Sequence, residues 1–181
     1  VPEPAYYLSE EFYERARGML EKRLTEFRLL HSISVSDTAV KMARRYGTDV
    51  AEARIGGLLH DWDKNFTDAE LFARADAYGI VLPEPSSEMG SLLHAITGAE
   101  TLRRTFPGIP EPIIQAVRRH TSGAIDMTDL DIIVYVSDMI EPLRTKEIGR
   151  AHVCARRVTS SPCARWWARR ASKTCSRTRT R

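Results

Sequence analysis

The chain has 181 residues, a length that suits one domain with or without an appendage. Its formal net charge of +3 averages two unlike parts, because residues 151–181 hold nine of the 27 Lys and Arg residues and none of the 24 Asp and Glu residues. Residues 1–150 therefore carry 18 basic and 24 acidic residues, a net charge of −6. The basic character belongs to the C-terminal tail, and the body of the chain is acidic.

The composition also argues against a disulfide-stabilised domain and against a membrane-spanning protein. The three cysteines, Cys154, Cys163 and Cys175, all lie in the tail, so disulfides cannot hold the body together. No apolar run approaches the roughly 20 residues that a membrane span needs. We therefore expect a soluble, cytoplasmic protein without a membrane partner.

Apolar residues recur at spacings of three and four from Ser9 to Tyr46, which predicts a helix that Gly47 ends. The positions in this stripe are Phe12, Met19, Leu20, Leu24, Phe27, Leu30, Val35, Ala39, Met42 and Ala43. The same spacing, together with capping residues and prolines, predicts five further helices. Thr48 and Asp49 open one that runs into His60 and Asp61, and the capping box Thr67–Glu70 opens one that stops at Gly79. A third covers residues 88–104, and a fourth has Pro110 and Pro112 in its first turn and leads to His120. The last covers residues 132–140, with the cap Thr128–Asp131 before it and Pro142 after it. Nothing alternates with a period of two over a useful length, so we predict an all-α domain.

The most informative stretch is residues 58–64, where an apolar helical run ends in His60, Asp61, a Trp-Asp pair and Lys64. Adjacent helical residues point about 100° apart, so His60 and Asp61 can both contact one ion that lies against the helix. Lys64 comes four residues after His60 and shares its face. An isolated His-Asp pair is more often a hydrogen-bonded structural pair, so the metal interpretation depends on the rest of the chain.

Three more histidines each lie beside an apolar helical stripe, and these are His31, His94 and His120. Asp138 lies inside the last predicted helix. Burying Asp61 and Asp138 without partners would cost several kcal/mol, a cost that a bound cation removes. Carboxylates combined with imidazoles suit iron or manganese rather than a thiolate-bound ion. The sequence therefore predicts a divalent metal centre, and it leaves open whether His94 and His120 bind a second ion or the substrate.

The residues His31, His60-Asp61 and Asp138 match an H…HD…D signature, and through it the chain resembles the HD-domain metal-dependent phosphohydrolases. A fuller set of five segments in the right order resembles the bacterial YqeK-type branch, the symmetrical bis(5'-nucleosyl)-tetraphosphatases. The segments are residues 28–31 (RLLH), 60–64 (HDWDK), 92–95 (LLHA), 119–123 (RHTSG) and 135–144 (YVSDMIEPLR). The resemblance covers residues 8–144 and implies an HD-domain helical bundle.

The resemblance also implies which residues carry the chemistry. The residues that hold an iron-type ion in the family match His31, His60, Asp61 and Asp138. The residues that line the nucleotide phosphates match Arg28, Lys64, His94, His120 and Thr121. The ion would activate water for in-line attack on a bridging phosphate, with Asp61 and Lys64 as the catalytic residues.

The activity implied by the resemblance is symmetrical cleavage of diadenosine tetraphosphate, a small-molecule nucleotide, to two ADP. Two alternatives remain at this point. One is an HD phosphohydrolase of a nucleoside monophosphate or a cyclic dinucleotide, and the other is a non-catalytic nucleotide-binding module. The sequence does not fix the oligomeric state, and a homodimer is compatible with it.

Residues 147–181 form a tail of a different kind, rich in Cys, Arg, Thr and Ser. Residues 147–153 (EIGRAHV) are the peptide that the string GAG ATC GGA AGA GCA CAC GTC encodes, and we identify that string as a short-read sequencing adapter. We therefore expect an HD domain over residues 1–146 and a non-native or disordered tail over residues 147–181. The alternative is a basic, aromatic arm for nucleic acid, since Arg-rich segments neutralise phosphates, but nucleic acid is not the partner we expect.

Overall fold

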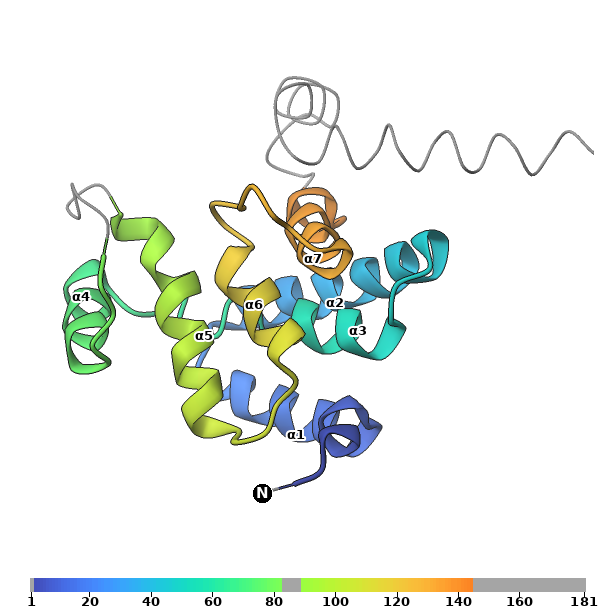
Figure 1. Cartoon of the computed structure of the whole chain (residues 1–181), viewed down its shortest axis with the longest axis horizontal. Helices are drawn as coiled ribbons and strands as arrows, with labels where there is room; N and C mark the ends of the chain where they lie inside the picture. The colour runs from blue at the N-terminus through green and yellow to red at the C-terminus, as the bar shows by residue number, and fades with distance from the viewer. Residues whose placement is uncertain (1, 83–88, 145–181) are drawn as a thin grey trace, which may run out of the picture.

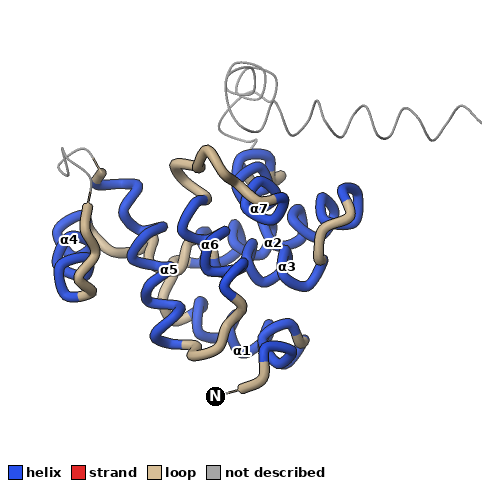
Figure 2. Tube along the Cα trace, viewed as in Figure 1, coloured by secondary structure: helices blue, strands red, loops and turns tan. Residues whose placement is uncertain are grey.

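The computed structural model describes residues 2–82 and 89–144, and within these ranges all regular secondary structure is helical (Figure 1, Figure 2). The elements in order are the 3-10 helix η1 (Pro4–Leu8), α1 (Glu10–Glu21), α2 (Glu26–Tyr46), α3 (Val50–Leu59), α4 (Asp68–Ala77), the 3-10 helix η3 (Gly90–Leu92), α5 (Leu93–Thr105), α6 (Glu111–Arg119) and α7 (Asp129–Ile140). The predicted all-α fold class is confirmed. None of the described helices is both long enough and apolar enough to cross a membrane. The predicted boundary between a domain over 1–146 and a tail over 147–181 lies outside the described residues.

Side-chain caps and one glycine fix where several helices begin and end. Thr67 and Thr128 each form a capping box, with Glu70 and Asp131 as the respective partners. Gly47 has a φ of 74° and ends α2 in the left-handed conformation that glycine adopts without strain. These signals are local, and the helix starts and the helix end that they predict are confirmed.

The apolar stripe from Ser9 to Tyr46 is divided between two helices, so the prediction of one continuous helix is wrong. The amides of Arg23 and Leu24 both donate to the carbonyl of Leu20, and Thr25 then caps α2 with an extended backbone. A helix cannot pass through an extended residue, so the stripe does not continue across this break. Two stripe positions after the break, Phe27 and Leu30, are accordingly 56% and 49% exposed.

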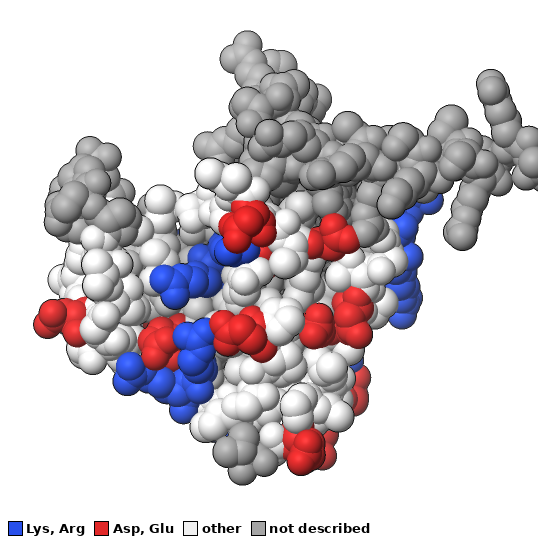
Figure 3. Space-filling model, viewed as in Figure 1, with Lys and Arg blue, Asp and Glu red and all other residues white. Residues whose placement is uncertain are grey.

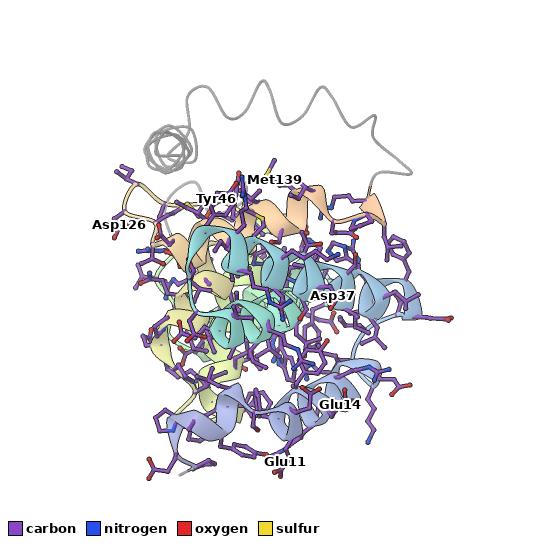
Figure 4. The ribbon with its side chains drawn as sticks, turned by 90° about the vertical axis from the view of Figure 1, so that its right-hand side faces the viewer. Glu11, Glu14, Asp37, Tyr46, Asp126 and Met139 are labelled. Atoms are coloured by element: carbon purple, nitrogen blue, oxygen red, sulfur yellow. The ribbon has the colours of Figure 1, made fainter. Side chains whose placement is uncertain are left out.

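The helices that carry the predicted site residues pack against one another. Helix α2 contacts α3 and α7, α3 contacts α6, and α6 contacts α5 and α7. In Figure 4, α7 with Met139 lies along one side and α1 with Glu11 and Glu14 along the opposite side, with α2 and α3 between them. Helix α4 lies at the edge of the bundle against α5 (Figure 1). The residues singled out in the sequence therefore meet at the centre of one bundle.

Helices α2 and α3 approach each other more closely than side chains normally allow. A Cβ atom added at Gly57 on α3 would lie 2.8 Å from the Cα of Ser36 and 3.2 Å from the carbonyl oxygen of Val35, both on α2. A glycine is required at this contact because the neighbouring atoms belong to the backbone and cannot move aside. This approach brings His31 on α2 close to His60 at the end of α3.

Candidate metal centre and substrate site

Four predicted metal ligands meet between α2, α3 and α7. His31 extends from α2, and Asp138 extends from the last turn of α7. His60 is the C-cap of α3, and Asp61 follows it. Nε2 of His31 lies 3.0 Å from Oδ1 of Asp138 and 3.2 Å from Nε2 of His60. Oδ2 of Asp61 lies 3.6 Å from Nε2 of His60 and 3.9 Å from Nε2 of His31. We call these four donors the first half-site.

The other carboxylate oxygen of Asp61 faces a second group of donors. Its Oδ1 lies 3.2 Å from Nε2 of His94, at the start of α5, and 3.6 Å from Nε2 of His120, the C-cap of α6. The two imidazole nitrogens lie 3.3 Å from each other. We call Asp61 Oδ1, His94 and His120 the second half-site. Asp61 thus stands between the two half-sites and offers one oxygen to each.

The spacing of the donors fits a divalent ion at either half-site. An ion held at about 2.0–2.2 Å by each ligand keeps neighbouring donor atoms about 3.0–3.6 Å apart. Most of the distances above fall in this range, and every donor residue is buried. Imidazole nitrogen combined with carboxylate oxygen is a donor set that suits iron or manganese. The first half-site offers two imidazoles and two carboxylates, and the second offers two imidazoles and one shared carboxylate.

His31, His60 and His120 are each oriented by a hydrogen bond at Nδ1, the ring nitrogen that faces away from the cluster. Nδ1–H of His31 donates to Oε1 of the buried Glu141 over 3.0 Å. The Nδ1–H groups of His60 and His120 donate to the backbone carbonyls of Gly57 and Val117, over 2.8 and 2.7 Å. Such hydrogen bonds fix the tautomer that leaves Nε2 available to an ion. The Nε2 atoms of all three rings point into the cluster.

Burial and neighbouring charges set the protonation of the cluster. Burial lowers the pKa of His60 to about 4, so this imidazole is neutral and able to bind an ion. Burial alone would raise the pKa of Asp61, but the surrounding imidazoles, chiefly those of His60 and His120, hold it well below its usual value. Burial likewise opposes ionisation of Asp138, yet its contact with His31 and the nearby charge of Arg144 hold its pKa well below its usual value. Both carboxylates are therefore charged and attract a cation.

The residues of this cluster lie within a region that matches a known family. The family model described as the HD domain matches residues 28–143. The chain belongs to the HD-domain family. This membership confirms the family that the five sequence segments predicted, and the match extends from the residue that begins the first segment to nearly the end of the last.

Several relatives of this HD domain carry the name of one activity. The protein from Bacillus subtilis (strain 168) named "Bis(5'-nucleosyl)-tetraphosphatase, symmetrical" is 35% identical over 131 residues, which are 72% of this chain and 70% of the relative. The protein of the same name from Staphylococcus aureus (strain NCTC 8325 / PS 47) is 30% identical over 134 residues, which are 73% of this chain and 68% of the relative. A crystal structure from Clostridium acetobutylicum, described as a predicted HD superfamily hydrolase involved in NAD metabolism, has a TM-score of 0.69 and 32% identity, covering 81% of this chain and 74% of that one.

The predicted phosphate-binding residues of the HD domain line the rim of the cluster. Nη1 of Arg28 lies 3.4 Å from Oδ2 of Asp61, and Nζ of Lys64 lies 3.4 Å from both ring nitrogens of His94. Burial lowers the pKa of Lys64, although Asp61 opposes the shift. Thr121 is half-buried and directly follows His120. The structure thus brings Arg28 and Lys64 to the same cluster as the histidines, and the roles of Arg28, Lys64 and Thr121 remain predictions.

A buried carboxylate that the sequence did not single out anchors the HD motif from behind. Asp63 accepts from Nη2 of Arg23 over 3.0 Å, from Nε of Arg74 over 3.3 Å and from Oγ1 of Thr101 over 3.0 Å. These partners come from the α1–α2 connection, α4 and α5. Three charge-assisted hydrogen bonds hold the turn after α3, so the flanking residues Asp61 and Lys64 are held as well.

Glu141 and Arg144 are two further residues to which the sequence gave no role. Glu141 supports His31, as described above, and Nη2 of Arg144 lies 2.8 Å from Oδ1 of Asp138. Both lie in the segment YVSDMIEPLR, so their presence in the motif was a signal. Nothing in the local pattern, however, shows that a glutamate before Pro142 is buried or that the chain turns back toward Asp138.

Proposed function

We propose that this HD domain is a metal-dependent hydrolase that cleaves diadenosine tetraphosphate symmetrically to two ADP. The observation that carries the proposal is the buried cluster around Asp61, with imidazole and carboxylate donors on one side and cationic side chains at its rim. The relatives named for this activity support it over a nucleoside monophosphate or cyclic dinucleotide hydrolase. The complete donor set favours an enzyme over a non-catalytic nucleotide-binding module.

His31, His60, Asp61 and Asp138 are the residues that would hold the ion, and iron or manganese fits their donor atoms. A bound ion would supply Lewis acidity and lower the pKa of water at the site. Asp61, His94 and His120 are the residues that would hold a second ion. The same two histidines are also suited to hydrogen-bond phosphate oxygens, and Asp61 contributes to both half-sites in either case.

The remaining residues would bind and orient the polyphosphate. Arg28 and Lys64 place positive charge beside the cluster, where it offsets the charge that develops on phosphate oxygens during cleavage. Thr121 directly follows His120 and would contribute a hydroxyl donor. The burial of Asp61 strengthens these electrostatic interactions, because water screens them less inside the protein.

The surface charges are consistent with a small nucleotide as the ligand. On the face seen in Figure 3, basic and acidic side chains lie next to one another, and the ion pairs of α5 and α6 include Arg103–Glu111 and Arg104–Glu100. Proteins that bind nucleic acid present a continuous basic surface instead. The described residues on this face therefore do not form such a surface.

Product analysis on the purified full chain tests the proposal. The chain is freed of metal by a chelator, reloaded with iron or manganese, and incubated with diadenosine tetraphosphate. We expect ADP as the sole nucleotide product in the reloaded protein and none after chelation. ATP and AMP as products, or hydrolysis confined to monophosphates or cyclic dinucleotides, would contradict the proposal. Size-exclusion chromatography of the same sample tests whether the chain is a homodimer, which the sequence leaves open. The predicted cytoplasmic location stays a prediction.

A further inference from the structure

A buried carboxylate at the start of α7 accepts hydrogen bonds from three other residues. Asp131 is fully buried, and its Oδ2 accepts from Nε2 of Gln115, from Nη1 of Arg119 and from the amide of Thr128, each over 2.9 Å. Gln115 and Arg119 lie on α6, and Thr128 caps α7. One oxygen atom therefore ties α6 to the first turn of α7.

Arg119 extends this connection into the loop between the two helices. Asp126 lies in that loop (Figure 4), and its carbonyl and its Oδ2 accept from Nη1 and Nη2 of Arg119 over 3.3 and 3.1 Å. The Asp126 side chain is 78% exposed, whereas that of Asp131 is completely buried. Water screens an exposed ion pair more strongly, so the bond to Asp131 contributes more to holding Arg119 in place.

Both members of this buried pair lie next to residues of the metal centre in the chain. Arg119 directly precedes His120, whose Nε2 lies 3.6 Å from Oδ1 of Asp61. Asp131 precedes Asp138 by seven residues on α7, which is two turns along the same face of the helix. Helix α6 thus positions a donor of the second half-site and α7 a donor of the first. The contact between these helices sets how the two donors lie relative to each other.

The orientation of His120 depends on where the last turn of α6 lies. Its Nδ1–H donates to the carbonyl of Val117 on the same helix over 2.7 Å, so the imidazole moves with that turn. Arg119 belongs to the turn and is held from α7. Both terminal nitrogens of Arg119 already donate to protein oxygens, which suits a supporting role better than contact with a ligand.

We propose that Asp131 is a positioning residue that acts through Arg119 to hold His120 against Asp61 in the second half-site. Asp131 contacts neither the substrate nor a reacting atom in this role. The inference rests on the proposed function for its effect on turnover, while the placement of His120 can be measured without turnover.

The test compares Asp131→Asn with Thr128→Ala in the full chain. Asparagine is nearly the same size as aspartate, but its amide has one acceptor oxygen and no charge to balance Arg119. Thr128→Ala removes the hydroxyl that accepts from the amide of Asp131 over 3.2 Å. It therefore weakens the start of the same helix but keeps the carboxylate and its bond to Arg119, which makes it the control for a loss of stability alone.

Three measurements separate positioning from general destabilisation. They are thermal unfolding, the ring ¹⁵N signals of the histidines in the chelator-treated chain, and kcat and KM for diadenosine tetraphosphate in the metal-loaded chain. We expect both variants to lower the thermal midpoint. Only Asp131→Asn should shift the signals of His120, while those of His31 and His60, on the other side of Asp61, stay in place.

The same displacement of His120 should reduce turnover. We expect Asp131→Asn to lower kcat about 10- to 100-fold, the cost of misplacing a group at the reacting centre by about 1 Å, and to change KM less. Thr128→Ala should keep a kcat close to that of the wild type. Equal losses of kcat in the two variants at equal losses of stability would overturn the proposal.

A double variant keeps the proposal falsifiable if Asp131→Asn folds poorly. When Arg119→Gln is combined with Asp131→Asn, two neutral side chains can hydrogen-bond to each other, and neither charge is left without its partner. If Asp131 acts through Arg119, the double variant should lose no more kcat than either single variant, because all three break one connection. Effects on kcat that multiply would show that the two residues act separately, and the proposal would be wrong.

The outcomes also separate this inference from the proposed function. If the wild-type chain does not cleave diadenosine tetraphosphate but Asp131→Asn shifts the signals of His120, the proposed function fails and the role of Asp131 stands. If the wild-type chain cleaves that substrate and Asp131→Asn changes neither these signals nor kcat by more than Thr128→Ala does, the role of Asp131 is wrong and the proposed function stands.

Discussion

The two half-sites share Asp61 and both use two imidazoles, yet their surroundings differ in charge. The first half-site adds the carboxylate of Asp138, and the carboxylate of Glu141 supports His31 from behind. Among the residues that the structure describes, the second half-site gains no further carboxylate, and the ammonium group of Lys64 lies 3.4 Å from the ring nitrogens of His94. The positive charge of Lys64 beside His94 opposes the binding of a metal ion there. Histidines therefore serve different purposes in the two half-sites. We infer that the first half-site holds the ion more tightly and that the second is shared between metal and phosphate.

Replacing the shared residue should have the largest effect, because it removes a donor from both half-sites. We expect Asp61→Ala to lose bound metal and to lower kcat for diadenosine tetraphosphate by about 10³-fold or more, with an unchanged helical circular dichroism spectrum. The control is Asp37→Ala, which removes an exposed carboxylate from α2 (Figure 4). Activity of Asp61→Ala close to that of the control would exclude a metal centre at Asp61.

A pair of histidine variants tests the difference between the half-sites directly. His31→Ala should lose the tightly bound ion, because it removes one of four donors and breaks the contact with Asp138. His94→Ala should keep about one ion per chain and lower turnover about 100-fold, since it affects phosphate stabilisation more than metal retention. Metal analysis after gel filtration, followed by kinetics, measures both. Equal metal loss in the two variants would show that the half-sites do not differ in the way we infer.

The sequence predicted the members of both half-sites because each member carries a local signal. His31, His60, His94 and His120 stand beside apolar helical spacings, and helix caps such as Thr128 mark where the helices start. These patterns depend on residues within one or two turns and are therefore visible without tertiary structure. The family resemblance then ordered the histidines into one site.

The supporting interactions could not be predicted in the same way, because their partners are far apart in the chain. Glu141 and His31 are separated by 110 residues, and Asp63 accepts hydrogen bonds from side chains in three different parts of the fold. The break at Thr25 was missed for a related reason, since apolar spacing can continue by chance through a residue whose side chain caps a new helix. Such contacts depend on how the helices pack, which periodicity alone does not specify.

The spacing between α2 and α3 offers a third way to disturb the first half-site alone. In Gly57→Ala the new Cβ would lie 2.8 Å from the Cα of Ser36, so the two helices must separate. We expect a loss of about 1–3 kcal/mol in the free energy of unfolding and weaker metal binding, because His31 and His60 move apart. Denaturant unfolding and metal titration measure the two effects.

Gly18→Ala is the matched control for this change. Gly18 is also helical, on α1, but a Cβ there would meet nothing within 4 Å. Alanine is the better helix former, so this variant should be as stable as the wild type or up to about 1 kcal/mol more stable, with unchanged metal affinity. If Gly57→Ala behaved like Gly18→Ala, the close approach of α2 and α3 would not be needed to position the two histidines.

The smallest expected effect comes from the support beneath His31. Oε1 of Glu141 accepts a hydrogen bond from Nδ1–H of His31, and Oε2 of the same carboxylate accepts one from the amide of Leu143. In Glu141→Gln the side chain keeps one carbonyl oxygen and gains an NH₂ group, so it can satisfy only one of the two donors. We expect metal affinity at the first half-site to fall about 10-fold, the lower end of the range for removing a residue that supports a metal ligand. The second half-site should be unaffected, because His120 is held by the carbonyl of Val117 instead.

Glu21→Gln, at an exposed position on α1, makes the same chemical change away from the site and should have no effect. Metal titrations of the two variants in parallel measure the difference. Unchanged metal affinity in Glu141→Gln would mean that the backbone of α2 alone orients His31. The two half-sites would then not differ in how their histidines are supported.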